Sequence, residues 1–246
     1  MSAFGGPNII DDGLVLYLDA GNIKSYQSGS TTWFDKSGNG NNGTLINGPT
    51  FNSGNGGSIS VDGTNDIITV DDNASIDLTE LTFSLWFNRG DILPLAPGDQ
   101  QSFFIKGNSY APGGDQLCPA FQLFGPTGGG QYNWRHPVSG SANIVPPSQI
   151  LFANQWYNMT ITHISTQTPI PYLNGVKQTD WVVTNPTAPL VPNNFQMSFA
   201  GDVNRPVDSR YASFNGKFAI FQMYNRALTE QEVLQNWNAQ KGRFGL

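Results

Sequence analysis

Thr82-Phe-Ser-Leu-Trp-Phe87 is the stretch that decides the fold class. Its apolar residues Phe83, Leu85 and Phe87 stand at every second position, and a strand places side chains with that spacing on one face. We therefore predict a strand here that lines the core of a β-protein.

Similar strands are predicted on the C-terminal side of this stretch. Residues 156–163 alternate in the same way, and so do Phe195, Met197 and Phe199. The run from Phe218 to Tyr224 is apolar almost throughout, which is typical of a strand buried on both faces. Asn174-Gly175 predicts a two-residue hairpin turn.

On the N-terminal side, residues 13–20 predict the first strand. Residues 58–70 contain two short strands around a turn rich in Asp, Asn and Gly, so we predict a hairpin. The many Gly and Pro residues between positions 88 and 130 predict long loops that brace short strands.

One helix is predicted near the C-terminus, over residues 229–241. Thr229 and Glu232 form a capping box, Val233 and Trp237 are one turn apart, and Gly242 can end the helix. We expect one domain over residues 13–246, preceded by a tether over residues 1–12. The predicted core consists of Phe83, Leu85, Phe87, Ile161, Phe199, Phe218 and Ile220, with Trp237 packed from the helix.

Composition excludes several functional classes. The formal charge of −6, from 18 acidic and 12 basic residues without a Lys/Arg cluster, argues against nucleic acid as a partner. Cys118 is the single cysteine, so no intramolecular disulfide can form. The first residues show neither a basic n-region nor an apolar h-region, and no apolar stretch reaches the roughly 20 residues of a membrane span. We expect no membrane insertion and synthesis in the cytoplasm without a Sec signal.

Four segments together resemble the laminin-G-like, concanavalin-A-like domain in its bacterial and phage form. They are Gly13-Leu-Val-Leu-Tyr-Leu-Asp19, Asp35-Lys-Ser-Gly-Asn-Gly-Asn-Asn-Gly43, Val61-Asp-Gly-Thr-Asn-Asp66 and Tyr224-Asn-Arg-Ala-Leu-Thr-Glu-Gln-Glu-Val233. The resemblance implies an all-β fold: a two-sheet antiparallel jelly-roll sandwich with a short C-terminal helix. Family members often carry an acidic pair where this chain has Ala219 and Ile220, which removes a carboxylate that a calcium site would use.

Both chain ends resemble structural proteins of tailed phages, especially those that infect cyanobacteria. The segments are Gly6-Pro-Asn-Ile-Ile-Asp-Asp-Gly-Leu-Val15 and Trp237-Asn-Ala-Gln-Lys-Gly-Arg-Phe-Gly-Leu246. This resemblance implies a virion component that contacts capsid or tail proteins, and the sequence leaves a homo-oligomer open.

No catalytic residues are predicted. Glucanases of this fold use a Glu-x-Asp-x-x-Glu strand motif, whereas this chain has only Glu80, Glu230 and Glu232. His136 and His163 lack the spacing of a zinc site or a catalytic triad.

Two kinds of binding residue are candidates. Asp35 and Asp62 lie in loops rich in oxygen ligands and could hold a structural Ca²⁺, although Asp is also a common turn former. Tyr132, Trp134 and Trp181 could stack on sugar rings or contact a protein partner, or could instead pack in the core.

The sequence therefore supports two functional hypotheses. The first is a non-catalytic phage structural protein, either a capsid decoration or a tail-associated knob. The alternative is a lectin that binds host-surface polysaccharide, and a glycan hydrolase is the least favoured class.

Overall fold

The computed structural model describes residues 7–90, 100–108, 116–124, 130–136, 140–147, 151–184, 187, 189–203 and 211–246. The side chains of residues 100, 108, 116–119, 123–124, 130–136, 140–143 and 211–213 lie outside that description.

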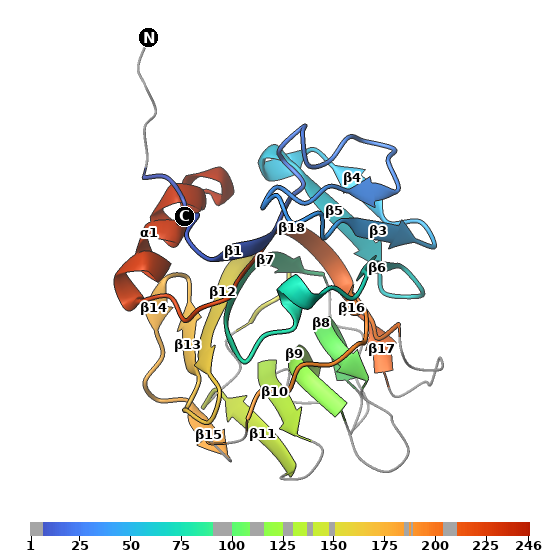
Figure 1. Cartoon of the computed structure of the whole chain (residues 1–246). Coiled ribbons are helices and arrows are strands. Elements are labelled where there is room, and N and C mark those ends of the chain that lie inside the picture. The colour runs from blue at the N-terminus through green and yellow to red at the C-terminus, as the bar shows by residue number, and fades with distance from the viewer. Residues whose placement is uncertain are drawn as a thin grey trace.

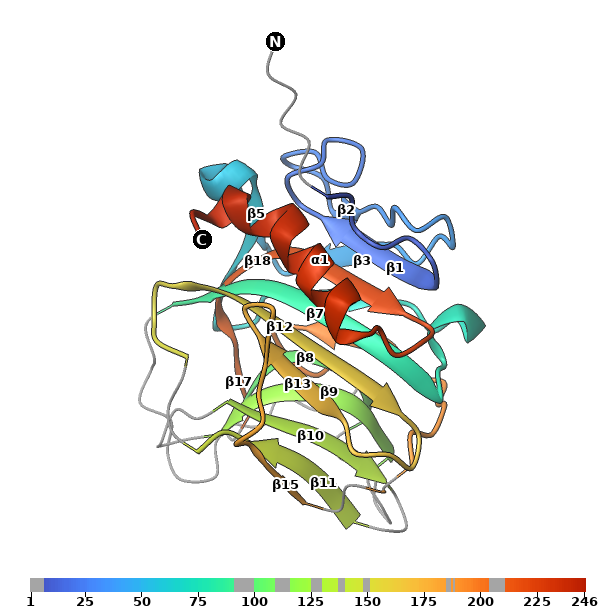
Figure 2. The same cartoon turned by 90° about the vertical axis from the view of Figure 1, so that its left-hand side faces the viewer.

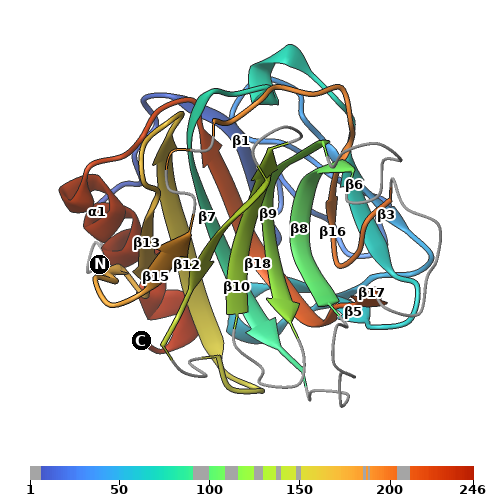
Figure 3. The same ribbon diagram turned by 90° about the horizontal axis from the view of Figure 1, so that it is seen from below.

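Two sheets pack face to face (Figures 1 and 3). The first sheet has eight strands, in the order β14 (Val176–Lys177), β13 (Ile170–Leu173), β12 (Trp156–Ile164), β7 (Glu80–Arg89), β18 (Asn215–Tyr224), β5 (Ser58–Asp62) and β4 (Thr50–Asn52), with β1 (Leu14–Asp19) beside β18.

The second sheet has ten strands. Its order is β15 (Val182–Thr184), β11 (Gly140–Val145), β10 (Gly130–His136), β9 (Gln116–Phe124), β8 (Gln100–Asn108), β16 (Met197–Phe199), β6 (Ile67–Val70), β3 (Gly43–Ile46) and β2 (Thr32–Trp33), with β17 (Tyr211–Ser213) beside β8. The β17–β8 pair is parallel, whereas the other described pairs are antiparallel. The predicted two-sheet jelly roll is confirmed.

The main core lies between the sheets and is rich in aromatic rings. Phe83 packs edge-on against Phe104, and Phe87 packs against Phe103, each with ring centroids 4.5 Å apart. These contacts join β7 of the first sheet to β8 of the second. Six predicted core residues belong to this cluster: Phe83, Leu85, Phe87, Ile161, Phe199 and Phe218.

A helix covers the outer face of the first sheet (Figure 2). It is α1 (Glu230–Gln240), and the predicted capping box is present, because Thr229 and Glu232 bond each other's backbone amides. Beneath it, Trp86 stacks on Trp237 with ring centroids 5.0 Å apart. Ile220, predicted for the main core, belongs to this second cluster, because it points out of the sheet toward the helix.

Gly242 does not end the helix, contrary to the prediction. The chain continues from α1 into a 3-10 helix, η3 (Lys241–Phe244), which brings Phe244 onto Trp86 with ring centroids 4.0 Å apart. The left-handed residue that stops it is Gly245, with φ +75°.

Two further short 3-10 helices are η1 (Gly54–Gly56) and η2 (Ala74–Ile76). Among the described residues, no helix is both long and apolar enough to span a bilayer.

The predicted hairpin over residues 58–70 is wrong. Its two strands exist, but β5 pairs with β4 and β18 in the first sheet, while β6 pairs with β3 and β16 in the second. The turn is a crossover between sheets, where a side-chain oxygen of Asp66 accepts the amide N–H of Asp62 at 3.0 Å. By contrast, the Asn174-Gly175 turn is confirmed: both residues have positive φ, at 51° and 75°, and join β13 to β14.

Two strands are longer than predicted. β8 and β9 have nine residues each, where the sequence indicated short strands between long loops. Register shifts between Ser102 and Phe104 and between Ile105 and Lys106 interrupt the alternation of β8. A bulge of this kind hides a strand from a period-two pattern.

The described part of the predicted tether is bound to the domain. The Ile10 N–H donates to Asn236 of α1 at 2.8 Å, and the Ile10 carbonyl accepts the Tyr224 hydroxyl at 3.0 Å. Gln235 donates to the Asn8 carbonyl at 2.8 Å. Residues 8–12 therefore run along α1 and β18, and residues 1–6 lie outside the description.

His163 makes the stability of this fold depend on pH. Its side chain is 3% exposed on β12, and burial lowers its pKa to about 4. The unfolded chain binds this proton near pH 6.5, so the free energy of unfolding should fall as pH drops from about 6.5 to about 4. The expected loss is about 3 kcal/mol at pH 4.

Urea denaturation of the wild type and of His163→Gln at several pH values tests this prediction. The free energy of unfolding should depend less on pH in the variant than in the wild type. At pH 8, where His163 is neutral in both the folded and the unfolded chain, the difference in free energy of unfolding between the two proteins gives the packing cost of the substitution alone. If this free energy depends on pH equally in the two proteins below pH 6.5, the prediction is wrong.

Candidate functional site

A cleft opens where the chain passes from the second sheet to the first. Its volume is about 470 Å³, within the range of small-ligand sites. Two segments form it: the connection between β1 and β2, and the turn between β3 and β4. The lining residues are Tyr26, Ser28, Gly29, Ser30, Thr31, Leu45, Asn47, Gly48, Pro49, Thr50 and Phe51. We call it the Tyr26–Phe51 cleft.

An aromatic pair forms one wall of the cleft. The rings of Tyr26 and Phe51 stack at 5.7 Å between centroids, with an angle of 27° between their planes. Tyr26 is 3% exposed, whereas Phe51 is half-buried and presents part of its ring. The Tyr26 hydroxyl donates to the Ser30 carbonyl at 2.9 Å, which fixes the ring against its own loop.

Hydroxyl groups and turns line the remainder. Among the described contacts, the hydroxyls of Ser28, Thr31 and Thr50 make no hydrogen bond within the chain. Asn47 and Gly48 take the left-handed backbone that the sharp β3–β4 turn requires, with φ of 68° and 116°. None of the residues that line the cleft is charged. The cleft therefore offers an aromatic surface and free hydroxyls without a charge.

Asp35, a predicted calcium ligand, organises its own loop. Its Oδ1 accepts the amides of Tyr17 and Ser37 at 2.9 and 2.8 Å. Its Oδ2 accepts the Ser37 hydroxyl at 2.7 Å and the Asn41 amide at 3.0 Å. Four donors thus surround this carboxylate. Asp35 acts here as a turn-forming residue, and its hydrogen bonds hold the loop on β1.

Asp62, the other predicted calcium ligand, begins the crossover turn. It is exposed and accepts the Thr64 and Asn65 amides at 2.8 and 3.4 Å. The bond from the Thr64 amide is the main reason that the pKa of Asp62 is lowered, while burial raises that of Asp66. In the described part of the chain, no three His, Cys, Asp or Glu side chains group as metal ligands. Calcium binding stays a prediction.

The predicted aromatic contacts divide into two cases. Trp181 is 7% exposed and belongs to the main core, which favours the packing alternative for this residue. The side chains of Tyr132 and Trp134 lie outside the described residues, although the backbone of β10 that carries them pairs with β9 and β11.

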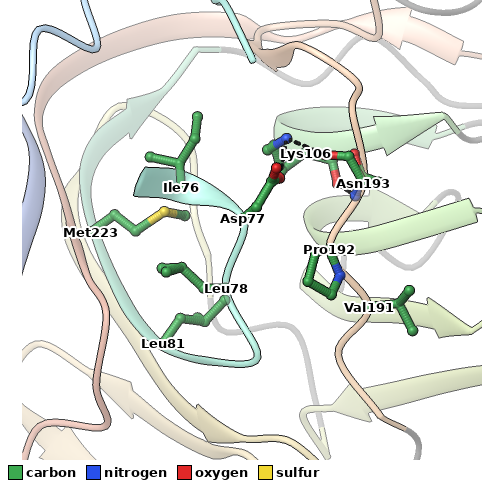
Figure 4. A pocket seen from close by; sticks show the side chains of 9 residues that line it. All are labelled: Ile76, Asp77, Leu78, Leu81, Lys106, Val191, Pro192, Asn193 and Met223. Carbon is green, nitrogen blue, oxygen red and sulfur yellow. Dashed lines mark hydrogen bonds and ion pairs between the residues drawn. The ribbon is translucent and has the colours of Figure 1, made fainter. Parts of the chain in front are cut away.

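A second hollow, beside Lys106, is filled by an ion pair (Figure 4). The Lys106 ammonium is 2.6 Å from Asp72 Oδ1 and 2.9 Å from Asp77 Oδ1. It also donates to the carbonyls of Asn193 and Phe195 at 2.9 and 2.8 Å. The remaining volume, about 10 Å³, holds at most one water molecule. This hollow is therefore part of the scaffold.

The three glutamates are not arranged as a hydrolase pair. Glu80 accepts the Ala227 amide at 2.9 Å. Glu232 caps α1 and forms a two-point ion pair with Arg226, which lowers the pKa of Glu232 to about 2. Glu230 is exposed on the first turn of α1.

The cleft residues were not predicted, because nothing in the sequence indicates that the two turns lie close together in the fold. Ser28-Gly29-Ser30 and Asn47-Gly48-Pro49 are visible as turns in the sequence. That both turns meet at one side of the sandwich follows only from the crossover between β3 and β4.

Solved structures share the fold. The binding domain of Paraclostridial Mosquitocidal Protein 1 matches with a TM-score of 0.68 and 22% identity, over 93% of this chain and 52% of that one. The botulinum neurotoxin serotype D ligand binding domain in complex with N-acetylneuraminic acid matches with a TM-score of 0.70 and 13% identity, over 94% and 52%. The botulinum neurotoxin type G receptor binding domain matches with 0.66 and 15%, over 93% and 52%. The chain thus spans about half the length of these structures.

At the level of sequence, no curated protein matches the chain. A laminin G family model, described as the concanavalin A-like lectin/glucanases superfamily, matches residues 62–234. That match covers the strands from β6 to β18, which belong to both sheets, and the start of α1, and it agrees with the predicted resemblance. The chain therefore belongs to the concanavalin A-like lectin/glucanase superfamily.

Proposed function

We propose that this chain is a non-catalytic glycan-binding domain and that the Tyr26–Phe51 cleft holds the sugar. One observation carries the proposal: an uncharged cleft of about 470 Å³ combines a stacked aromatic pair with free hydroxyls. Aromatic faces pack against the C–H groups of sugars, and hydroxyl and backbone groups orient the ligand. The fold supports it, since matching structures include a ligand binding domain solved with a sugar acid.

The chemistry of the cleft favours a neutral glycan. N-acetylneuraminic acid, present in the serotype D structure, carries a carboxylate. Such a group needs a cation or several donors, and no lysine, arginine or histidine lines the Tyr26–Phe51 cleft. We therefore expect neutral hexose or N-acetylhexosamine polysaccharides to bind in preference to acidic ones.

Phe51→Ala should weaken glycan binding about tenfold or more, because it removes the half-exposed ring of the aromatic pair. A glycan array would first identify the ligand, and calorimetric titration would then compare the variants. Phe34→Ala is the matched control, since Phe34 is an exposed phenylalanine, at 46%, outside the cleft. Its affinity should equal that of the wild type.

A different result would place the site elsewhere. If Trp134→Ala abolishes binding while Phe51→Ala leaves it unchanged, the sugar binds at the surface of β10, and the cleft assignment is wrong. Release of reducing sugar from the bound polysaccharide would contradict the non-catalytic role.

We also infer that the domain is a virion component, as a capsid decoration or a tail-associated knob. The resemblance of residues 6–15 and 237–246 to tailed-phage structural proteins supports this inference. Cryo-electron microscopy of purified particles should locate the domain on the capsid or the tail. Its absence from purified particles would overturn the virion role without affecting the glycan proposal.

A further inference from the structure

Arg89, at the end of β7, is a buried cation without a partner among the described residues. Its side chain is 1% exposed, and its Nε, Nη1 and Nη2 atoms have no hydrogen-bond partner in the part of the chain that the structure describes. The side chain shares the face of Phe83, Leu85 and Phe87, so it points between the two sheets. A guanidinium removed from water without an opposite charge is strongly unfavourable. Something other than the described residues must therefore neutralise it.

A second buried donor lies at the same end of the sandwich. Gln101 of β8 is 2% exposed, and none of the described residues accepts a hydrogen bond from its Nε2. The neighbouring Ser102 accepts a hydrogen bond from Gln122 at 2.8 Å. Since Gln122 follows Phe121 of the main core on β9, this pair points to the outer face of the second sheet. Because successive strand residues point to opposite faces, Gln101 points inward.

The Phe87–Phe103 contact places these two residues near each other. Arg89 is two positions beyond Phe87, and Gln101 is two positions before Phe103, toward the same end of the sandwich. The connection from β17 to β18 confirms this placement. Ala212 pairs with Gln101 and, four residues later, Gly216 pairs with Arg89.

Among the described side chains, the unpaired groups of Arg89 and Gln101 at this end are donors. Arg89 and the Gln101 amide nitrogen together provide seven N–H groups. The nearby Tyr157 hydroxyl makes its hydrogen bonds to other groups: it accepts the Phe152 amide at 3.0 Å and donates to Gln155 Oε1 at 3.1 Å. Burial lowers the pKa of Arg89, and none of the described carboxylates forms an ion pair with it. A group of donors with one positive charge is complementary to an anion.

We propose that a small anion, of the size of chloride or formate, binds between the sheets at Arg89 and Gln101. The near-complete burial of both side chains excludes a larger ligand such as an oligosaccharide. The site shares no residue with the Tyr26–Phe51 cleft, so it is independent of the glycan proposal.

Anion titration tests the site in solution. At constant ionic strength, replacing gluconate, which is too large to enter, by chloride or formate should raise the melting temperature by about 3–6 °C. Arg89→Met should abolish this rise, and Gln101→Leu should reduce it. Lys24→Gln is the matched control for general salt effects, because Lys24 is an exposed cation, and it should keep the full rise.

Two results would overturn the proposal. One is a wild-type melting temperature that does not respond to chloride or formate, and the other is an equal response in Arg89→Met. If Arg89→Met does not fold, bromide-soaked wild-type crystals decide the question. An anomalous peak within hydrogen-bonding distance of the Arg89 guanidinium supports the site, and its absence rejects it.

Discussion

Trp237→Ala should reduce the free energy of unfolding by about 3–5 kcal/mol, the usual cost of removing a large buried aromatic side chain. Trp237 is 9% exposed and lies flat on Trp86, with an angle of 5° between the ring planes. Trp86 also stacks on Phe244, and this second contact depends on η3, which directly follows α1. Losing the indole therefore removes a stacking contact that fixes α1 to the first sheet. The melting temperature should fall by roughly 10 °C.

The same helix supplies the control. Leu234 is 45% exposed, so Leu234→Ala should change stability by no more than about 0.5 kcal/mol. Chemical denaturation of both variants measures the difference. If the two variants unfold at the same denaturant concentration, α1 contributes little to the stability of the sandwich.

Lys106→Met should destabilise the fold by about 3–5 kcal/mol, because it removes a buried cation from two partly exposed carboxylates and two backbone carbonyls. The ammonium is 2% exposed and contacts Asp72, Asp77 and two backbone carbonyls. These partners belong to the segments before β7 and before β16, and Lys106 belongs to β8. One side chain therefore holds three segments together at this end of the sandwich.

A second variant separates loss of charge balance from loss of packing. Adding Asp72→Asn and Asp77→Asn to Lys106→Met removes the uncompensated negative charges and should recover part of the lost stability. Lys177→Met, at an exposed position on β14, should be nearly neutral. No recovery in the triple variant would show that the ion pair is not the source of the loss.

Much of the fold follows from the sequence. Apolar and polar residues alternate clearly wherever a strand is regular and every second side chain faces the core. β7 and β12 were predictable for this reason, and β18 was predictable from its nearly continuous apolar run. The turn between β5 and β6 was not, since Asp, Asn and Gly suit a crossover as well as a hairpin. The choice between a crossover and a hairpin depends on the partner strands, β18 and β16, which lie more than 120 residues further along the chain.

The candidate site was predicted less well than the fold. Asp35 and Asp62 stood out because of their residue type, but each accepts hydrogen bonds from nearby backbone amides. Tyr26 and Phe51 belong to no periodic pattern, and only the folded chain brings their rings together. Likewise, nothing in the sequence distinguishes Arg89 from an exposed arginine at the end of a strand.

The pairing of β1 with β18 determines when this protein can fold during translation. Leu14 is opposite Tyr224, so the first strand leaves the ribosome about 200 residues before its partner is synthesised. At about 5–20 residues per second, this interval lasts roughly 10–40 s. During that time the apolar β1 has no sheet to join, and residues 8–12 have no helix to bind. The nascent chain must therefore stay soluble in an incomplete state, and a chaperone that binds short apolar strands would find β1 available throughout.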